Sequence, residues 1–314
     1  MKTAATKQLL TLKEAREWAS SFLGCPISES NISYLIRYGK IKKYGENDDT
    51  QINANDLKNY YQLLKNKSSI ANFLNRIICG DTIDVMKKIP DNSVNLVITS
   101  PPYNLKNSTG NGMKDGRGGK WANAALKNGY SHYNDNIPHK EYVKWQRDCL
   151  TEMMRLIPEN GAIFYNHKWR VQAGLLQDRQ DIVNGFPVRQ IIIWKRAGGL
   201  NFNAGYFLPT YEVIYLIAKP KFKLAPKANA YGDIWEVPQE MKNGHPAPFP
   251  IKLIDKIIAS TNAKIILDPF MGSGTTAISA INFKRNYIGI DISPDYCESA
   301  KKRIKNHLSQ TKLF

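Results

Sequence analysis

Two kinds of hydrophobic pattern alternate along most of the chain after residue 75. Short apolar runs rich in β-branched residues are typical of buried strands, and longer segments with apolar positions at helical spacing are typical of amphipathic helices. The expected strands cover 76–81, 93–98, 161–166, 188–195, 212–219, 286–291 and the beginning of 264–276. The expected helices cover 82–88, 140–156, 169–177, 251–260 and 277–282.

The N-terminal region has a different pattern and is expected to form a separate, small helical unit. Thr11 is followed three residues later by Glu14, which is the capping-box signature of a helix start. Helices are expected over 12–23, 31–38 and 56–64, with a linker over 66–69. The predicted domains are a helical domain over 1–66 and a larger domain over 70–314.

Composition bounds the class of protein. The chain has 314 residues, of which 42% are hydrophobic, so one large domain and one small domain can each bury a core. No apolar run is long enough to span a bilayer, and the first ten residues lack the apolar centre of a signal peptide. A cytoplasmic protein without a membrane partner is therefore expected.

Charge and cysteine usage narrow the partners. The formal net charge of +17 favours a polyanion such as nucleic acid, although a generally basic solvated surface would have the same composition. The four cysteines are scattered without metal-type spacing, so they are interpreted as free thiols and no metal site is expected. None follows a proline in the way that a catalytic cysteine of cytosine-C5 methyltransferases does.

The stretch Thr99–Asn104 follows the apolar run 93–98 and carries the first candidate chemistry. Two prolines end the strand, because proline cannot donate to a sheet ladder. The hydroxyl of Ser100 and the proline carbonyls offer acceptors for an exocyclic amino group, and Tyr103 offers a flat face for a flipped base. For Pro-Pro-Tyr alone, a packed tyrosine at a strand end is the preferred interpretation.

A second motif lies in 264–276, which is interpreted as a strand, a tight glycine loop and the start of a helix. Gly272 and Gly274 allow the backbone to approach a ligand, and the helix start supplies free N–H groups. Asp291 ends the next strand, 291 − 274 = 17 positions after Gly274. That spacing is close to the ~20 residues at which an acidic residue meets ribose hydroxyls in nucleotide-binding folds.

The two motifs together resemble those of the β group of DNA amino-methyltransferases, with the catalytic loop first and the cofactor loop late in the chain. The resemblance covers about 76–305. It implies an α/β, Rossmann-like S-adenosylmethionine-dependent methyltransferase fold with a mainly parallel central sheet, beside the small N-terminal helical domain. It also implies direct methyl transfer from S-adenosylmethionine to the amino group of a flipped base, as in restriction-modification methylases.

The resemblance assigns roles residue by residue. The implied catalytic residues are Ser100, Pro101, Pro102 and Tyr103. The implied cofactor-binding residues are Asp81, Thr99, His245, Pro248, Asp268, Phe270, Gly272, Ser273, Gly274, Thr275 and Asp291. For Asp81, a simple helix cap is the competing role. His245 is interpreted as an orienting or capping residue, because no partner ligand for a metal has suitable spacing.

The target base is less clearly indicated. The serine form of the loop, with Ser100 before the two prolines, is typical of cytosine-N4 enzymes, whereas adenine-N6 enzymes more often have Asp or Asn there. Asn104 after the tyrosine is, however, common among adenine enzymes. We favour N4 of cytosine and keep N6 of adenine as the alternative.

DNA contacts are expected from three regions. The N-terminal unit is similar to a MerR-type winged helix-turn-helix, although a packing or dimerisation module fits nearly as well. The glycine- and asparagine-rich segment 105–136 is interpreted as a flexible DNA-contacting loop, and 221–243 as a short, irregular target-recognition region. The candidate DNA-binding residues are Arg37, Lys40, Lys42, Lys106, Lys114, Arg117 and Lys120.

The expected substrate is double-stranded DNA, and a cognate restriction endonuclease and a homodimer are left open as partners. A non-catalytic DNA-binding regulator built on a methyltransferase fold is the main alternative from another class. Intact Ser100, Tyr103, Asp268, Gly272 and Asp291 argue against it. A methyltransferase of RNA or of a small molecule is a further alternative.

Overall fold

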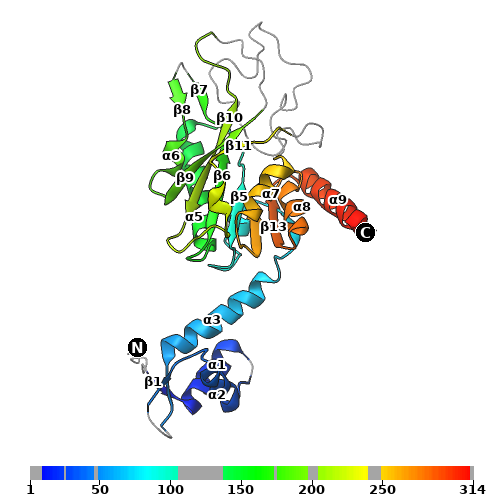
Figure 1. The fold of residues 1–314 in the computed structure, drawn as a ribbon. Coiled ribbons are helices and arrows are strands. Elements are labelled where there is room, and N and C mark those ends of the chain that lie inside the picture. The colour runs from blue at the N-terminus through cyan, green and yellow to red at the C-terminus, as the bar shows by residue number, and fades with distance from the viewer. Residues whose placement is uncertain are drawn as a thin grey trace. The chain divides into compact units, whose positions relative to one another are not determined.

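The computed structural model describes residues 9–24, 26–45, 49–104, 137–172, 175–196, 204–239 and 249–311. The side chains of 65–69, 170, 172 and 311 are outside this description as well. The chain divides into two compact units, Met1–Asn72 and Phe73–Phe314 (Figure 1). Among the described residues, no helix combines the length and apolarity needed to cross a membrane.

The first unit combines three helices with a small antiparallel sheet. Strands β1 (Leu9–Thr11), β3 (Gln51–Asn53) and β2 (Lys43–Tyr44) form the sheet in that order. Helix α1 (Leu12–Leu23) begins with the predicted capping box of Thr11 and Glu14, and α2 (Glu29–Arg37) begins with a second box. The small apolar core contains Ala15, Ala19, Ile32, Leu35, Ile52 and Leu57.

Two boundaries in this unit differ from the sequence interpretation. Helix α3 (Ala54–Ile70) is longer than the predicted 56–64. It includes 66–69, the predicted linker, so these residues are helical. The polar run of Asn66 to Ser69 has weak helix propensity, but it continues a helix that is already nucleated, where propagation needs little further stabilisation.

The second unit is built on an eight-stranded sheet with the strand order β11-β9-β10-β6-β5-β12-β13-β4. The strands are β4 (Arg76–Cys79), β5 (Leu96–Thr99), β6 (Ala162–His167), β9 (Val188–Lys195), β10 (Tyr211–Ala218), β11 (Ile234–Glu236), β12 (Ile265–Asp268) and β13 (Asn286–Asp291). Only β10 runs antiparallel to its neighbours, and all other pairs are parallel. The mainly parallel α/β sheet expected from the sequence is thereby confirmed.

Two groups of helices accompany the sheet (Figure 1). Helix α5 (His139–Leu156) contacts both α4 (Thr82–Met86) and α6 (Gln180–Val183). Helix α8 (Thr275–Asn282) contacts both α7 (Ile251–Ala259) and α9 (Pro294–Thr311). Strands β5 and β6 are neighbours in the middle of the sheet and are buried along their whole length, so they lie in the core of this unit.

Two segments near the sheet were predicted incorrectly. Residues 169–177 were expected to be helical, but they form the antiparallel strands β7 (Arg170–Gln172) and β8 (Leu175–Gln177). Each of these strands has only three residues, which is too short for the sequence pattern to separate a strand from a helix. The region 221–243 was expected to be irregular, but β11 pairs in parallel with β9. A three-residue strand leaves almost no periodicity to detect.

Candidate active site and cofactor site

One edge of the sheet collects most of the residues singled out from the sequence. Strands β4, β5, β6, β12 and β13 are mutually parallel, so their carboxyl ends lie at the same edge. Ser100 follows β5, Asp268 ends β12, Asp291 ends β13 and Asp81 follows β4 by two positions. This is the edge at which ligands bind in open α/β sheets.

The candidate catalytic loop, Thr99–Asn104, is fixed in place by the contacts of Tyr103. The hydroxyl oxygens of Ser100 and Tyr103 lie 2.6 Å apart, and the Tyr103 hydroxyl donates to a Glu212 carboxylate oxygen at 3.0 Å. One face of the Tyr103 ring stacks on His167, with 4.7 Å between ring centroids, and the side chain is only 7% exposed. Ser100 is half-buried. The structure thus brings Ser100 and Tyr103 into direct contact.

The proline carbonyls differ in their surroundings. The Tyr142 hydroxyl donates to the carbonyl of Pro102 at 2.9 Å, which ties the loop to helix α5. His167 Nε2 lies 2.5 Å from the same Tyr142 hydroxyl, so the loop, the helix and the end of β6 form one polar cluster. Because Pro102 is engaged in this way, Pro101 is the better candidate to face a substrate.

Several residues at this edge were missed in the sequence. Asn166, His167 and Glu212 are at most 6% exposed although each lies within an otherwise apolar strand. A buried polar residue in such a strand is costly unless it has hydrogen-bond partners, and that conflict was the available signal. Arg196, which pairs with Glu212 at 3.2 Å, lies just beyond β9 and gave no signal of its own.

Asp268 links the catalytic loop to the cofactor loop. Its carboxylate accepts hydrogen bonds from the hydroxyls of Thr99 at 3.3 Å and Thr276 at 2.6 Å, and from the backbone N–H of Phe270 at 3.1 Å. Burial raises the pKa of Asp268 to about 7, against the lowering effect of these three donors. The two motifs, 169 residues apart in sequence, are therefore joined by a direct side-chain contact.

The glycine loop is shaped by Asp291 and by helix α9. The backbone N–H of Gly272 donates to the Asp291 carboxylate at 2.9 Å. Gly274 has φ +83°, and a Cβ there would lie 3.1 Å from the Cβ of Ala300. Arg303 reaches from α9 to the Ser273 carbonyl at 3.1 Å and to the Thr275 hydroxyl at 3.0 Å. Glycine is thus required at 274 both for its conformation and for its close packing.

Asp81 has the capping role that was its competing interpretation. Its carboxylate accepts the backbone N–H groups of Ile83 at 2.9 Å and Asp84 at 3.1 Å, at the start of α4. The side chain is exposed at the carboxyl edge. The backbone N–H of Gly80 donates to the Asp291 carbonyl at 2.9 Å, which holds Asp81 beside the end of β13.

The chemistry of this donor set fits S-adenosylmethionine. Asp81, Asp268 and Asp291 provide three carboxylates around a glycine loop and a helix start, a combination suited to hydroxyl groups and positive charge. Phe270 is half-buried beside them and makes an edge-on contact with Trp145 at 5.6 Å. Within the described residues, no group of three or more metal-ligating side chains occurs.

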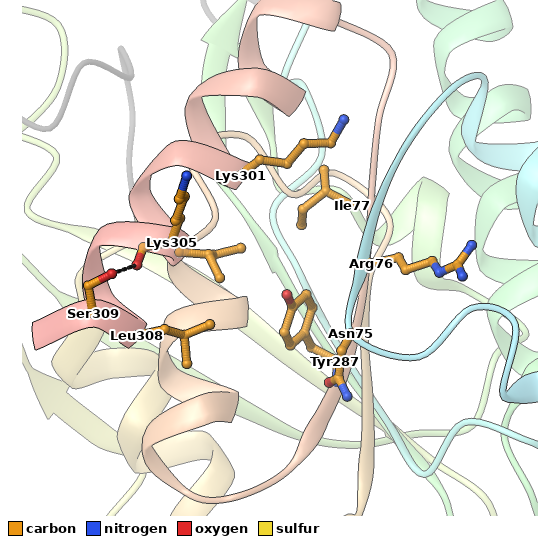
Figure 2. A pocket seen from close by; sticks show the side chains of 9 residues that line it. Asn75, Arg76, Ile77, Tyr287, Lys301, Lys305, Leu308 and Ser309 are labelled. Carbon is orange, nitrogen blue, oxygen red and sulfur yellow. Dashed lines mark hydrogen bonds between the residues drawn. The ribbon is translucent and has the colours of Figure 1, made fainter. Parts of the chain in front are cut away.

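A cavity of about 580 Å³ lies between β4 and α9 and is separate from this site. In Figure 2, Lys305 and Leu308 of α9 lie across from Ile77 and Tyr287. Arg76 and Tyr287 are at or near the amino ends of their strands, opposite to the carboxyl edge. None of the predicted site residues lines this cavity.

The remaining site predictions fall elsewhere. Arg37, Lys40 and Lys42 are exposed in the first unit, at the end of α2 and just after it. His245 and Pro248 lie outside the described residues, as do Lys106, Lys114, Arg117 and Lys120.

Comparisons with known proteins agree with this architecture. The chain is 28% identical to the type II methyltransferase M.BglII of Bacillus subtilis, over 88% of this chain and 80% of that protein. A putative DNA modification methylase from Thermus thermophilus, solved with S-adenosylmethionine, has a similar fold, with a TM-score of 0.55 at 23% identity over 74% of this chain and 93% of that one. The cytosine-N4-specific PvuII DNA methyltransferase gives a TM-score of 0.56 at 18% identity over 72% and 84% of the two chains.

A family model described as DNA methylase, for N6 and N4 methyltransferases, matches residues 94–302. That match includes the catalytic loop, the cofactor loop and every strand of the large sheet except β4. Because it spans well over half of the sequence, the chain belongs to this family of S-adenosylmethionine-dependent DNA amino-methyltransferases.

Proposed function

We propose that this DNA methyltransferase acts on duplex DNA at specific sequences and methylates N4 of cytosine. The observation that carries the choice of base is Ser100, which presents a half-buried hydroxyl at the carboxyl end of β5, directly after Thr99. Thr99 in turn bonds to Asp268 of the cofactor loop. A serine at this position is the form typical of cytosine-N4 enzymes.

In the proposed reaction, the exocyclic nitrogen of a flipped base would attack the methyl carbon of bound S-adenosylmethionine in line, so that the N–C bond forms as the S–C bond breaks and S-adenosylhomocysteine leaves. The methylated amino group would then release one proton to solvent. Ser100 Oγ and the Pro101 carbonyl accept hydrogen bonds from the amino N–H groups and so orient the nitrogen lone pair. The Tyr103 ring, which is held by its stack on His167, is the aromatic surface proposed to stack with the base. A thiolate is not part of the proposed reaction: of the three described cysteines, Cys149 and Cys297 are buried, and burial raises the pKa of the Cys297 thiol to about 12.

Asn104, the residue that argued for adenine, is engaged elsewhere. Its side-chain nitrogen donates to the Ile137 carbonyl at 2.8 Å, and its oxygen accepts the Ile137 N–H at 3.0 Å. This pairing supports a structural role at the base of the segment 105–136. N6 of adenine stays the alternative target, because the family includes methyltransferases of both types.

The test of the base is a product analysis. The protein is incubated with unmethylated DNA of mixed sequence and methyl-labelled S-adenosylmethionine, and the nucleosides are separated by mass spectrometry. Label in N4-methylcytosine supports the proposal, and label in N6-methyladenine replaces the base while keeping the mechanism. In a parallel incubation with RNA, label in the RNA but not in the DNA would show that RNA is the substrate. Absence of label with intact cofactor binding by calorimetry, on DNA of high sequence diversity, would favour the regulator.

The N-terminal unit is included in the proposal as a DNA-binding domain. Its three helices and small antiparallel sheet are compatible with a winged helix-turn-helix of the MerR type. Arg37, Lys40 and Lys42 would contact phosphates. Two exposed aromatic residues lie near Arg37 in sequence, Tyr34 within α2 and Tyr38 as its C-cap. A homodimer and a cognate restriction endonuclease are further partners to be sought by sedimentation and by co-purification.

A further inference from the structure

A buried ion pair lies next to the catalytic loop, and neither of its residues has been given a functional role so far. Glu212 is the second residue of β10, and β10 runs antiparallel to β6. The amino end of β10 therefore meets the carboxyl end of β6, at the catalytic edge. Glu212 is 6% exposed, and one carboxylate oxygen lies 3.2 Å from Arg196 Nη1. Arg196 is always protonated, so it balances a charge that would otherwise be costly to bury.

The second oxygen of Glu212 faces the catalytic loop. It accepts the Tyr103 hydroxyl at 3.0 Å and Asn166 Nδ2 at 2.8 Å. Asn166 Nδ2 is also within 2.7 Å of the Tyr103 hydroxyl and 3.3 Å of Ser100 Oγ. In the part of the chain that the structure describes, Asn166 Oδ1 is buried without a partner. The amide orientation is thus set by Glu212, because turning the amide over would place its oxygen against the carboxylate.

These contacts fix the direction of each hydrogen bond. An ionised carboxylate only accepts, so the Tyr103 hydroxyl must donate to Glu212. The Tyr103 oxygen then accepts the proton of Ser100, whose oxygen lies 2.6 Å away. The hydroxyl proton of Ser100 is therefore directed inward, and its oxygen presents a lone pair to the substrate side. An acceptor is what the amino group of a target base requires.

We propose that Glu212, held by Arg196, is a positioning residue that acts through Tyr103 and keeps Ser100 as a hydrogen-bond acceptor for the target amino group. The inference rests on the proposed function of Ser100. Glu212 does not touch the substrate, and its effect is transmitted by two hydroxyl groups. The same contacts would favour the small positive charge that develops on the amino nitrogen during methyl transfer.

The variant Glu212→Gln tests the direction of this relay. Arg196 needs an acceptor, so the glutamine oxygen stays with Arg196 and the NH₂ group faces Tyr103. Tyr103 then accepts from glutamine and donates to Ser100, which turns the Ser100 proton toward the substrate. We expect kcat to fall roughly 100-fold, as for loss of one transition-state hydrogen bond, with the Kd of S-adenosylmethionine unchanged within about twofold.

A double-mutant cycle separates positioning from a purely structural role. If Glu212 acts through Ser100, Glu212→Gln adds less than about threefold to the loss already caused by Ser100→Ala in single turnovers. Fully additive losses would overturn the inference but leave the proposed function intact. Glu236→Gln is the matched control. Glu236 of β11 also pairs with a basic residue, Lys195 of β9, but this ion pair is exposed. The Glu236→Gln variant is expected to retain wild-type kcat.

Tyr103→Phe is the second variant, for the case that Glu212→Gln does not fold. It keeps the aromatic ring and the Glu212–Arg196 pair but removes the hydroxyl that connects them to Ser100. We expect a loss of kcat of the same order as for Glu212→Gln, and no further loss when the two are combined. Wild-type kcat in Tyr103→Phe contradicts the relay. Absence of any methyl transfer by the wild-type chain would overturn the proposed function and this inference together.

Discussion

At the scale of single residues, Asp268 is in the most unusual environment of the site. It is 3% exposed, it bonds to residues of both motifs, and burial raises its pKa to about 7. An unfolded aspartate titrates near 3.9, so between about pH 4 and pH 7 the folded chain binds a proton that the unfolded chain has released. The group therefore stabilises the fold fully below about pH 4, and this contribution is lost as pH rises through about 7.

The first prediction concerns cofactor binding at Asp268. The cofactor carries a positive sulfonium, so it should bind the carboxylate form and release a proton. We expect its affinity to rise about tenfold per pH unit up to about pH 7 and then to level off. The Asp268→Asn variant should bind S-adenosylmethionine more weakly and without this pH dependence. Its unfolding free energy, compared with that of the wild type, should be more favourable at pH 8 than at pH 5. Calorimetry across pH measures both, and an equally steep slope in Asp268→Asn would contradict the prediction.

At the scale of elements, the side chain of Arg155 joins helix α5 to the loop before β5, in addition to backbone bonds from Asn92 and Val94 to the last turn of the helix. Arg155 donates to the carbonyls of Met86 at 2.7 Å and Ile89 at 3.0 Å, and it also pairs with Asp91. Met86 is the last residue of α4, so Arg155 satisfies a helix-end carbonyl that has no partner within the helix. This contact helps to hold residues 86–91, which lead into β5, against helix α5.

The second prediction follows from these carbonyls. Arg155→Met keeps the aliphatic stem but removes the donor to the Ile89 carbonyl, while the Met86 carbonyl keeps the backbone N–H of Ile89, and we expect a loss of about 1–3 kcal/mol in unfolding free energy. Lys144→Met on the same helix is the control, because its bridge to Asp148 is exposed and contributes only about 0–0.5 kcal/mol. Urea unfolding, followed on the transition that S-adenosylmethionine stabilises, measures both. Similar losses in the two variants would contradict the argument.

Elements were predictable from the sequence where one local rule dominated. The capping box of Thr11 and Glu14, the apolar strand before Ser100 and the glycine loop at 272–274 each determine their structure within a few residues. The strand β11 and the pair β7–β8 were not predictable, because a three-residue strand leaves almost no periodicity and depends on its partner strand. Glu212 was missed for the same reason: its partners Tyr103 and Asn166 are 109 and 46 residues away.

At the scale of the whole molecule, the charge of +17 is shared between two compact units. If the whole surface were basic, DNA would bind equally well to many parts of it. If the N-terminal unit is a DNA-binding domain, binding should depend mainly on a small set of its basic residues. The first unit offers Arg37, Lys40 and Lys42, exposed at the end of α2 and beyond it. The second unit offers an equal number of exposed lysines on α9, namely Lys301, Lys302 and Lys305. These two triplets allow charge to be separated from location.

The third prediction compares the two triplets in the full chain. Replacing Arg37, Lys40 and Lys42 with alanine should weaken DNA binding and lower the slope of log affinity against log salt by up to about 2.7, since each lost phosphate contact contributes about 0.9. The α9 triplet removes the same charge and should leave that slope nearly unchanged. Fluorescence anisotropy over a salt series measures both variants, and kcat at saturating DNA should stay at the wild-type value in each. Equal slopes in the two variants would mean that the affinity comes from net charge alone, and the N-terminal unit would then be better explained as a packing or dimerisation module.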